Sequence, residues 1–311
     1  MTHNQAGRSK AYAALVAGIL CIAWSAIFVR WTGIPGAASA FYRLLIPAIV
    51  LLPTWLLPGS RQKLSLKSYG IIAIGAFFFA LDLAFYNTSI LQTSAANSTL
   101  LGNNTPIFVG LLSWMLFKKR PAISFWAGLA MAMVGAAVIV NADLARHAKL
   151  GAGDVMALAA SACFAVYLIA TERIREHTNT LEFLRLAIGL SAIFTFIFAI
   201  ILRVPLGIPN RHSLLALLGL GFISQLGGYL ALTYALGHLP ATVTSVSLLS
   251  QGPLTAVLAA LLLGEPLTRP QIIGGILVLA GIAFANRLSQ PGDEANAFVE
   301  ATVPESDETP A

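Results

Sequence analysis

Residues 212–264 read HSLLALLGLGFISQLGGYLALTYALGHLPATVTSVSLLSQGPLTAVLAALLLG, a stretch that contains no Asp, Glu, Lys or Arg. A helix needs roughly 20 mostly apolar residues to cross a lipid bilayer, so this stretch is long enough for two such helices. The turn residues Gly237-His238-Leu239-Pro240 divide it near the middle. The stretch therefore predicts two membrane-spanning helices joined by a tight turn.

Similar apolar runs occupy most of the chain. Residues 11–29 and 121–142 also lack acidic and basic side chains, and residues 83–117 fit two helical segments that divide near Gln92-Thr93-Ser94. We expect an all-α integral membrane protein with ten membrane-spanning helices. Their predicted bounds are 11–30, 38–57, 69–91, 95–117, 122–141, 153–172, 181–202, 213–237, 240–263 and 269–287.

The composition agrees with burial in lipid. Hydrophobic residues make up 57% of the chain and charged residues only 10%, whereas a soluble domain has roughly 25% charged residues. The net charge of +6 could suggest a nucleic-acid partner, but no basic stripe with interleaved aromatic residues occurs. The expected partners are therefore the lipid bilayer and a small molecule, without nucleic acid, and no oligomer is required.

The positions of Lys and Arg predict the orientation, because cytoplasmic loops are enriched in them. With the N-terminus inside, the basic residues of the first half fall mainly in cytoplasmic segments, and the bias is weak in the second half. An even number of spans places both termini in the cytoplasm of a bacterial inner membrane. Ala38-Ser39-Ala40 resembles a signal-peptide cleavage site, but Arg30 and Trp31 interrupt the approach to it, so we expect the first helix to be retained.

The two halves of the chain resemble each other. When they are aligned, Leu83-Ala84 falls on Leu230-Ala231 and Pro106 falls on Pro253. Each half holds five predicted spans, an odd number, so the halves enter the membrane with opposite polarity, as in inverted-repeat transporters. The predicted organisation is a cytoplasmic N-terminus at 1–10, a first repeat at 11–141, a connecting loop at 142–152, a second repeat at 153–287 and a disordered acidic tail at 288–311.

Two inverted five-helix repeats, with an Arg inside the second span of each half and polar residues before matched prolines, resemble the drug/metabolite transporter superfamily, EamA type. Within it the chain is most similar to the aromatic amino-acid exporter (YddG) branch. The resemblance covers about residues 11–287. It implies a basket of helices around a central cavity, which exports small metabolites such as aromatic or other neutral amino acids by alternating access.

Two polar segments occupy matching positions before these prolines. They are Asn103-Asn104-Thr105-Pro106 and Ser250-Gln251-Gly252-Pro253. A proline inside a helix frees a backbone carbonyl, and in lipid such a break usually faces protein or a water-filled cavity. We expect Asn103, Asn104, Ser250 and Gln251 to bind substrate and the prolines to act in gating; the alternative is that these are tolerated kinks whose amides join helices.

Asp82 is the acidic residue that lies well inside a predicted span. An unpaired carboxylate is costly in a bilayer, so Asp82 should be protonated, paired or hydrated. We expect it to relay a proton or to bind a substrate ammonium group. The alternative is a structural role in which it pairs with a basic or hydroxyl group of the bundle.

Arg43 and Arg185 are repeat-related and could anchor a carboxylate or hold gates at opposite membrane faces. Alternatively, they extend to the interface, and Glu182 is placed to pair with Arg185 along one helix face. Aromatic residues inside spans are further candidates for the cavity wall, with ordinary packing as the alternative. These aromatic candidates are Trp24, Tyr86, Tyr229 and Tyr234.

A secondary transporter is the expected function, because no Walker A motif for ATP hydrolysis occurs. A membrane-embedded enzyme would need a base, nucleophile or metal cluster in a pocket, and the five histidines all lie outside the middle of the predicted spans. Cys21 and Cys163 show no ligand spacing. No enzyme activity, cofactor or metal is therefore expected, and a receptor or channel remains the other alternative.

Overall fold

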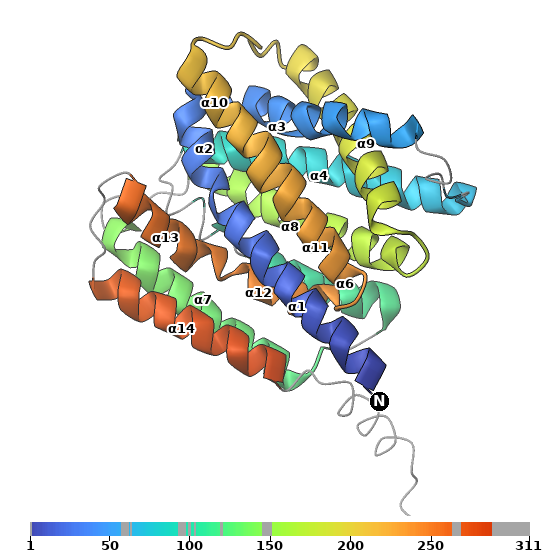
Figure 1. Ribbon diagram of the computed structural model, residues 1–311. Coiled ribbons are helices and arrows are strands. Elements are labelled where there is room, and N and C mark those ends of the chain that lie inside the picture. Colours follow the sequence, from blue (N-terminus) through green and yellow to red (C-terminus); the bar gives the residue numbers. More distant parts are fainter. Residues whose placement is uncertain are drawn as a thin grey trace, which may run out of the picture.

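The computed structural model describes residues 2–56, 62, 64–92, 98, 101–102, 104–118, 121–144, 151–262 and 269–287, and this part of the chain is helical (Figure 1). The helices of the first half are α1 (Thr2–Ala23), α2 (Ser25–Thr32), α3 (Gly36–Leu51), the 3₁₀ turn η1 (Leu52–Leu56), α4 (Leu66–Gln92), α6 (Thr105–Phe117) and α7 (Ile123–Leu144). Those of the second half are α8 (Ala152–Arg175), α9 (Thr180–Ile201), α10 (Arg211–Gly219), the π-helical segment η2 (Leu220–Gly227), α11 (Gly228–Leu236), α12 (Ala241–Leu248), α13 (Gln251–Leu262) and α14 (Arg269–Arg287).

Within the described residues, seven helical stretches are long and apolar enough to cross a membrane. Four of them are composites of consecutive elements: Ser9–Thr32, Gly36–Thr54, Arg211–Leu236 and Ala241–Leu262. Shorter apolar helices occur at Thr105–Leu116, Ile123–Val138 and Ile272–Ala285. Most of the first half of the predicted span 95–117 lies outside the described residues, as do residues 145–150 of the predicted connecting loop and the predicted tail at 288–311.

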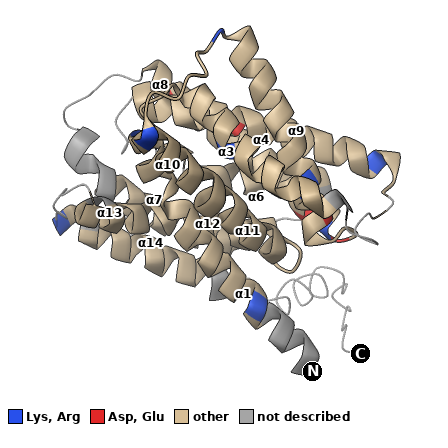
Figure 2. Cartoon of the chain, turned by 45° about the horizontal axis from the view of Figure 1, so that its top comes forward, with Lys and Arg blue, Asp and Glu red and all other residues tan. Residues whose placement is uncertain are grey.

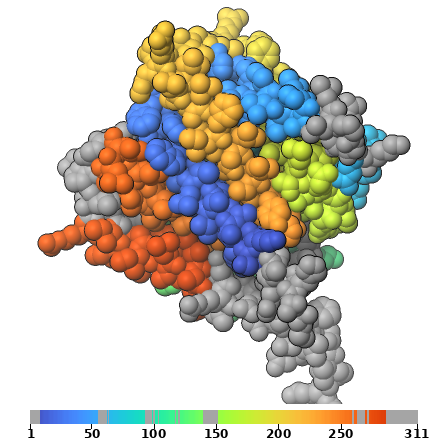
Figure 3. All heavy atoms as spheres, in the orientation of Figure 1, coloured from blue at the N-terminus to red at the C-terminus, as the bar shows by residue number. Residues whose placement is uncertain are grey.

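The outer surface of the bundle is apolar. Large hydrophobic side chains are exposed along the helices, among them Ile49, Ile193 and Ile276. Long parts of the helices carry no Lys, Arg, Asp or Glu (Figure 2). Figure 3 shows α1, α3 and the 211–236 helix lying beside one another on one such face. A surface of this kind is stable in contact with lipid, where exposed apolar groups cost no free energy.

Four helix pairs form the main packing contacts. They are α7 with α14, α4 with α8, α1 with α11, and α3 with α9. The pair α7–α14 is the closest, since a Cβ atom on Gly281 would lie 2.6 Å from both the Ala132 nitrogen and the Gly128 oxygen. Glycine and alanine at this interface let the two backbones approach each other, as expected for helices that associate in lipid.

A break in the helix precedes each of the two matched prolines. α6 begins at Thr105 with Pro106 in its first turn, and α12 ends at Leu248 before α13 begins at Gln251. At both breaks a polar side chain donates a hydrogen bond to a backbone carbonyl. At the first break, Asn104 Nδ2 donates to the Leu101 carbonyl at 2.9 Å. Ser250 Oγ donates to the Ser247 carbonyl at 2.7 Å. These bonds satisfy backbone groups that lipid could not.

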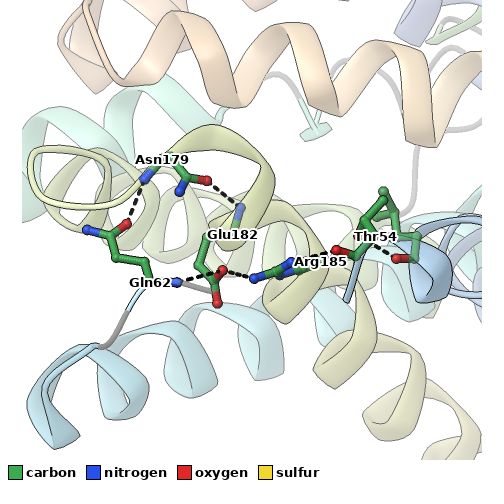
Figure 4. Close-up of polar contacts among 6 residues, drawn as sticks. Thr54, Gln62, Asn179, Glu182 and Arg185 are labelled. Atoms are coloured by element: carbon green, nitrogen blue, oxygen red, sulfur yellow. Dashed lines mark hydrogen bonds and ion pairs between the residues drawn. The ribbon is translucent and has the colours of Figure 1, made fainter. Parts of the chain in front are cut away.

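A cluster of polar residues joins the segment after α3 to the turn between α8 and α9 (Figure 4). Arg185 is buried and forms an ion pair with Glu182, and its Nη1 donates to the Thr54 carbonyl at 3.3 Å. The Gln62 backbone nitrogen donates to Glu182 Oε2 at 3.3 Å, and Asn179 caps α9 by accepting from the Glu182 nitrogen at 2.7 Å. We call these five residues the polar clamp; it ties together chain segments from the two halves.

The α7–α14 contact yields a test by substitution. We predict that Gly281→Ala destabilises the protein by about 1–3 kcal/mol, because the added methyl group meets the backbone of α7. Gly189→Ala in α9 is the control, since nothing lies within 4 Å of its added Cβ and alanine favours a helix by about 1 kcal/mol. Unfolding in detergent micelles measures both variants, and equal stabilities would contradict the close packing.

The polar clamp yields a second test. We predict that Glu182→Gln destabilises the protein by about 3–5 kcal/mol, because it leaves the buried Arg185 charge without its carboxylate. The exposed pair Arg173–Glu176 has the same i,i+3 spacing, so Glu176→Gln should cost about 0–1 kcal/mol. Thermal unfolding of both variants decides the matter, and a Glu182→Gln variant as stable as Glu176→Gln would show that the pair contributes nothing.

Candidate functional site

A cavity of about 70 Å³ lies inside the bundle, between helices of both halves. Elements from α1 to α13 contribute to its wall, so segments far apart in the sequence meet there. The wall residues include Ser25, Arg43, Asp82, Tyr86, Gly102, Thr105, Ser161, Phe164, Tyr229, Leu248, Gln251 and Thr255. Five of the residues singled out in the sequence analysis are among them: Arg43, Asp82, Tyr86, Tyr229 and Gln251.

Arg43 brings a positive charge to the wall from α3, where it is only 2% exposed. Its Nε donates to Gln225 Oε1 and its Nη1 to Ser25 Oγ, both at 2.7 Å. The guanidinium carbon also lies 5.8 Å from the centre of the Tyr229 ring, within the range of a cation–π contact. These neighbours hold the guanidinium in place without cancelling its charge.

Asp82 brings a carboxyl group to the same cavity from α4 and is 8% exposed. Among the described residues, none donates a hydrogen bond to its carboxylate or forms an ion pair with it. The cavity thus presents an acidic and a basic group that are not directly paired with each other.

Aromatic rings form the apolar part of the wall. Tyr86 lies one helical turn after Asp82, and Phe164 and Tyr229 come from α8 and α11. Two further buried rings, Phe79 and Tyr167, pack beside them. The ring centres of Phe79 and Tyr167 are 4.3 Å apart and the rings are stacked, and the ring centre of Phe79 lies 4.8 Å from that of Tyr229. Packed rings of this kind hold their orientation and offer a rigid apolar surface to a ligand.

Four hydroxyl side chains of the wall were not predicted from the sequence. Ser25, Thr105, Ser161 and Thr255 all line the cavity, and the last two lie near a polar or aromatic wall residue in the sequence. Thr255 follows Gln251 by four residues and Ser161 precedes Phe164 by three, so each pair shares a helix face. That spacing was the available signal, but small polar residues are so common in membrane helices that it does not stand out.

Other predicted site residues lie elsewhere. Trp24 packs in an aromatic group with Phe28, their ring centres 5.7 Å apart, and Tyr234 lies 4.6 Å from the His238 ring beside the turn that follows α11. Arg185 belongs to the polar clamp. Asn104, Ser250, Pro106 and Pro253 lie at the helix breaks and are not part of the described cavity wall; Asn103 lies outside the described residues.

The donor groups of the cavity suit an organic molecule. The described residues contain no group of three or more His, Cys, Asp or Glu side chains that could hold a metal ion. The wall instead offers a guanidinium, a carboxylate, hydroxyls and aromatic rings. Such a set can bind a small molecule that carries both charges and an apolar part.

Comparison with known proteins places this fold among transporters. The protein is similar to the transporter YwfM of Bacillus subtilis (strain 168), with 26% identity over 80% of this chain and 83% of the relative. A protein of Streptantibioticus cattleyicolor named "Probable terminal-alkyne amino-acid exporter" is also 26% identical, over 90% of this chain and 94% of the relative. A solved crystal structure has the same fold, with a TM-score of 0.74, 19% identity, and coverage of 91% of this chain and 99% of that one.

The family model for EamA-like transporters matches residues 9–141 and again residues 151–287. The two matches together cover far more than half of the chain and fall one on each half of the bundle. The chain therefore belongs to the EamA-like transporter family.

Proposed function

We propose that this membrane transporter is a secondary transporter that exports small zwitterionic metabolites, in particular aromatic or other neutral amino acids. The observation that carries the proposal is the presence of Arg43 and Asp82 in the wall of one internal cavity, without a direct ion pair between them. Charged groups inside a membrane protein are costly and usually mark a substrate or ion pathway. A ligand that carries both opposite charges would compensate both residues.

An α-amino acid fits this wall chemically. Its carboxylate would bind to Arg43, its ammonium group to Asp82, and its side chain would pack against Tyr86, Phe164 and Tyr229. A neutral side chain is expected because the wall places no further acid or base among its described residues. The name of the Streptantibioticus cattleyicolor relative, which refers to an amino-acid exporter, supports both the substrate class and the direction.

Alternating access between two inverted five-helix repeats is the proposed mechanism. The supporting observation is that the main packing partners occur in matched positions of the two halves. The first span of each half packs on the third span of the other, as α1 on α11 and α8 on α4. The second spans pack on each other (α3 with α9), and so do the fifth (α7 with α14). Such a two-fold pattern permits two equivalent packings that open the cavity to opposite sides.

The proposed topology has ten spans, with a first repeat at 11–141, a second at 153–287 and both termini on the cytoplasmic side of a bacterial inner membrane. The seven longer helical stretches and the three shorter apolar helices would together form the ten spans. The polar clamp would then lie at the cytoplasmic face. It joins the segment just before the basic residue Lys67 to the segment just after the basic residue Arg173, and both segments are proposed to be cytoplasmic.

Transport measurements on proteoliposomes test the substrate and the mechanism. We predict saturable transport of neutral amino acids that is accelerated by substrate on the opposite side, because a carrier returns faster when loaded. Asp82→Asn should slow this transport about tenfold or more and remove its dependence on a pH gradient, since an amide keeps the shape but does not titrate. Flux that does not saturate and shows no acceleration by opposite substrate would favour a channel.

Asp154→Asn provides the matched control for Asp82→Asn. Asp154 accepts a hydrogen bond from the Gly151 nitrogen at 2.9 Å at the start of α8, outside the cavity wall. Its amide variant should transport at the wild-type rate with the wild-type pH profile. An Asp82→Asn variant that folds and behaves like Asp154→Asn would exclude Asp82 from substrate binding and from proton coupling.

Reporter fusions test the topology. We predict that alkaline phosphatase fused after Gln290 is inactive, because the proposed C-terminus is cytoplasmic and this enzyme matures only in the periplasm. A fusion after Gly207, between α9 and α10, should be active, since that segment is proposed to face the periplasm. The opposite pair of activities would invert the proposed orientation.

A further inference from the structure

We propose that Gln225 is a positioning residue that presents the guanidinium of Arg43 to a substrate carboxylate. This inference rests on the proposed function and deepens it, because it assigns the orientation of the charge that selects the substrate. Gln225 is fully buried and does not line the cavity itself. It acts through its amide oxygen, which accepts the hydrogen bond from Arg43 Nε at 2.7 Å.

Gln225 lies in the π-helical segment η2, in the middle of the helical stretch Arg211–Leu236. A π-helical turn holds an extra residue, which turns the side chains that follow toward a different direction, and such turns often occur at functional sites. Here Ser224 Oγ donates to the Cys21 carbonyl of α1 at 3.1 Å, while the neighbouring Gln225 bonds to Arg43 of α3. The segment therefore places successive side chains on two different helices.

A glycine contact sets the distance between η2 and α3. A Cβ atom on Gly221 would lie 2.8 Å from Ile46, so the bare glycine is what allows η2 to approach α3 there. Ile46 lies about one turn after Arg43 on α3, and Gln225 about one turn after Gly221 on η2. The close approach at one turn thus brings Gln225 within hydrogen-bond distance of Arg43 at the next.

A count of the donors of Arg43 shows which edge of its guanidinium remains for a ligand. The group has five N–H donors and no acceptor. Nε–H is bonded to Gln225 and one Nη1–H to Ser25, whereas Nη2 forms no hydrogen bond with the described residues. Three N–H donors, one on Nη1 and two on Nη2, therefore remain to bind a carboxylate.

The neutrality of the Gln225 side chain matters as much as its position. Because Arg43 can only donate, the amide oxygen must face Nε, and the amide nitrogen turns away, where it has no hydrogen-bond partner among the described residues. A carboxylate at this position would hold the guanidinium equally well but would cancel its charge. Gln225 orients the positive charge and leaves it available to the substrate.

The test compares amino acids with the amines obtained from them by removal of the carboxylate. Binding of radiolabelled tryptophan, phenylalanine and leucine to the purified full-length protein is measured alongside tryptamine, phenethylamine and isopentylamine. The readout is the preference for the amino acid over its amine, that is, the ratio of the two dissociation constants. A change in overall stability leaves this ratio unaffected, because it alters both members of each pair.

We expect Gln225→Met to lower the preference on the order of tenfold, because it removes the strong acceptor at nearly constant volume. Gln225→Glu should lower the preference on the order of a hundredfold, because the added charge competes with the substrate carboxylate for Arg43. Ser224→Ala is the control on the same segment. It removes the bond to Cys21 but touches no group of Arg43, so the preference should remain that of the wild type.

The outcomes separate this inference from the proposed function. A wild-type protein without preference for the amino acids, or an Arg43→Gln variant that keeps the preference, overturns the proposed function and this inference with it. If Arg43→Gln abolishes the preference but Gln225→Glu leaves it intact, only the positioning role is overturned. If the Gln225 variants lose affinity for the amino acid and for its amine equally, the role of Gln225 is structural and the positioning role is also overturned.

Discussion

The burial of Arg43 is the constraint on which the central architecture depends. A guanidinium inside an apolar bundle is stable only where hydrogen-bond acceptors and a compensating charge surround it. Ser25 of α2 and Gln225 of η2 supply acceptors, the Tyr229 ring of α11 supplies a cation–π contact, and the carboxyl of Asp82 on α4 lines the same cavity as Arg43. Each of these residues comes from a different element, so the requirement of one side chain brings four parts of the chain together around it.

Small residues make this convergence possible. Helices in lipid gain little from the hydrophobic effect between them and associate through close packing and hydrogen bonds instead. Gly221 lets η2 approach α3, and Gly128 and Gly281 do the same for α7 and α14. The polar clamp around Arg185 follows the same rule, and there Glu182 supplies the compensating charge within the helix. The two buried arginines thus have different surroundings, and of the two only Arg43 lines the described cavity.

The candidate site was partly predictable from the sequence. Asp82 and Arg43 stand out because charges inside apolar runs are rare, and both line the cavity, as do Tyr86, Tyr229 and Gln251. Trp24 and Tyr234 met the same sequence criterion but pack against Phe28 and His238. An aromatic residue inside a span can face lipid, protein or the cavity. The rotation of the helix decides between these, and the residue type alone does not indicate that rotation. Gln225 was not singled out because a glutamine in a span can serve many partners.

The sequence by itself determined that the chain is helical and membrane-embedded. Runs of about 20 apolar residues with few charges permit little else, because lipid requires every backbone group to bond within its own helix. The similarity of the two halves was also readable, since several residues, among them Pro106 and Pro253, fall at matching positions. Only the tertiary structure decided which of the polar residues share the cavity, where the helix becomes π-helical at η2, and which arginine meets a carboxylate on its own helix. Those outcomes depend on helix rotation and on contacts between residues far apart in the chain, and hydrophobic periodicity within one span does not encode them.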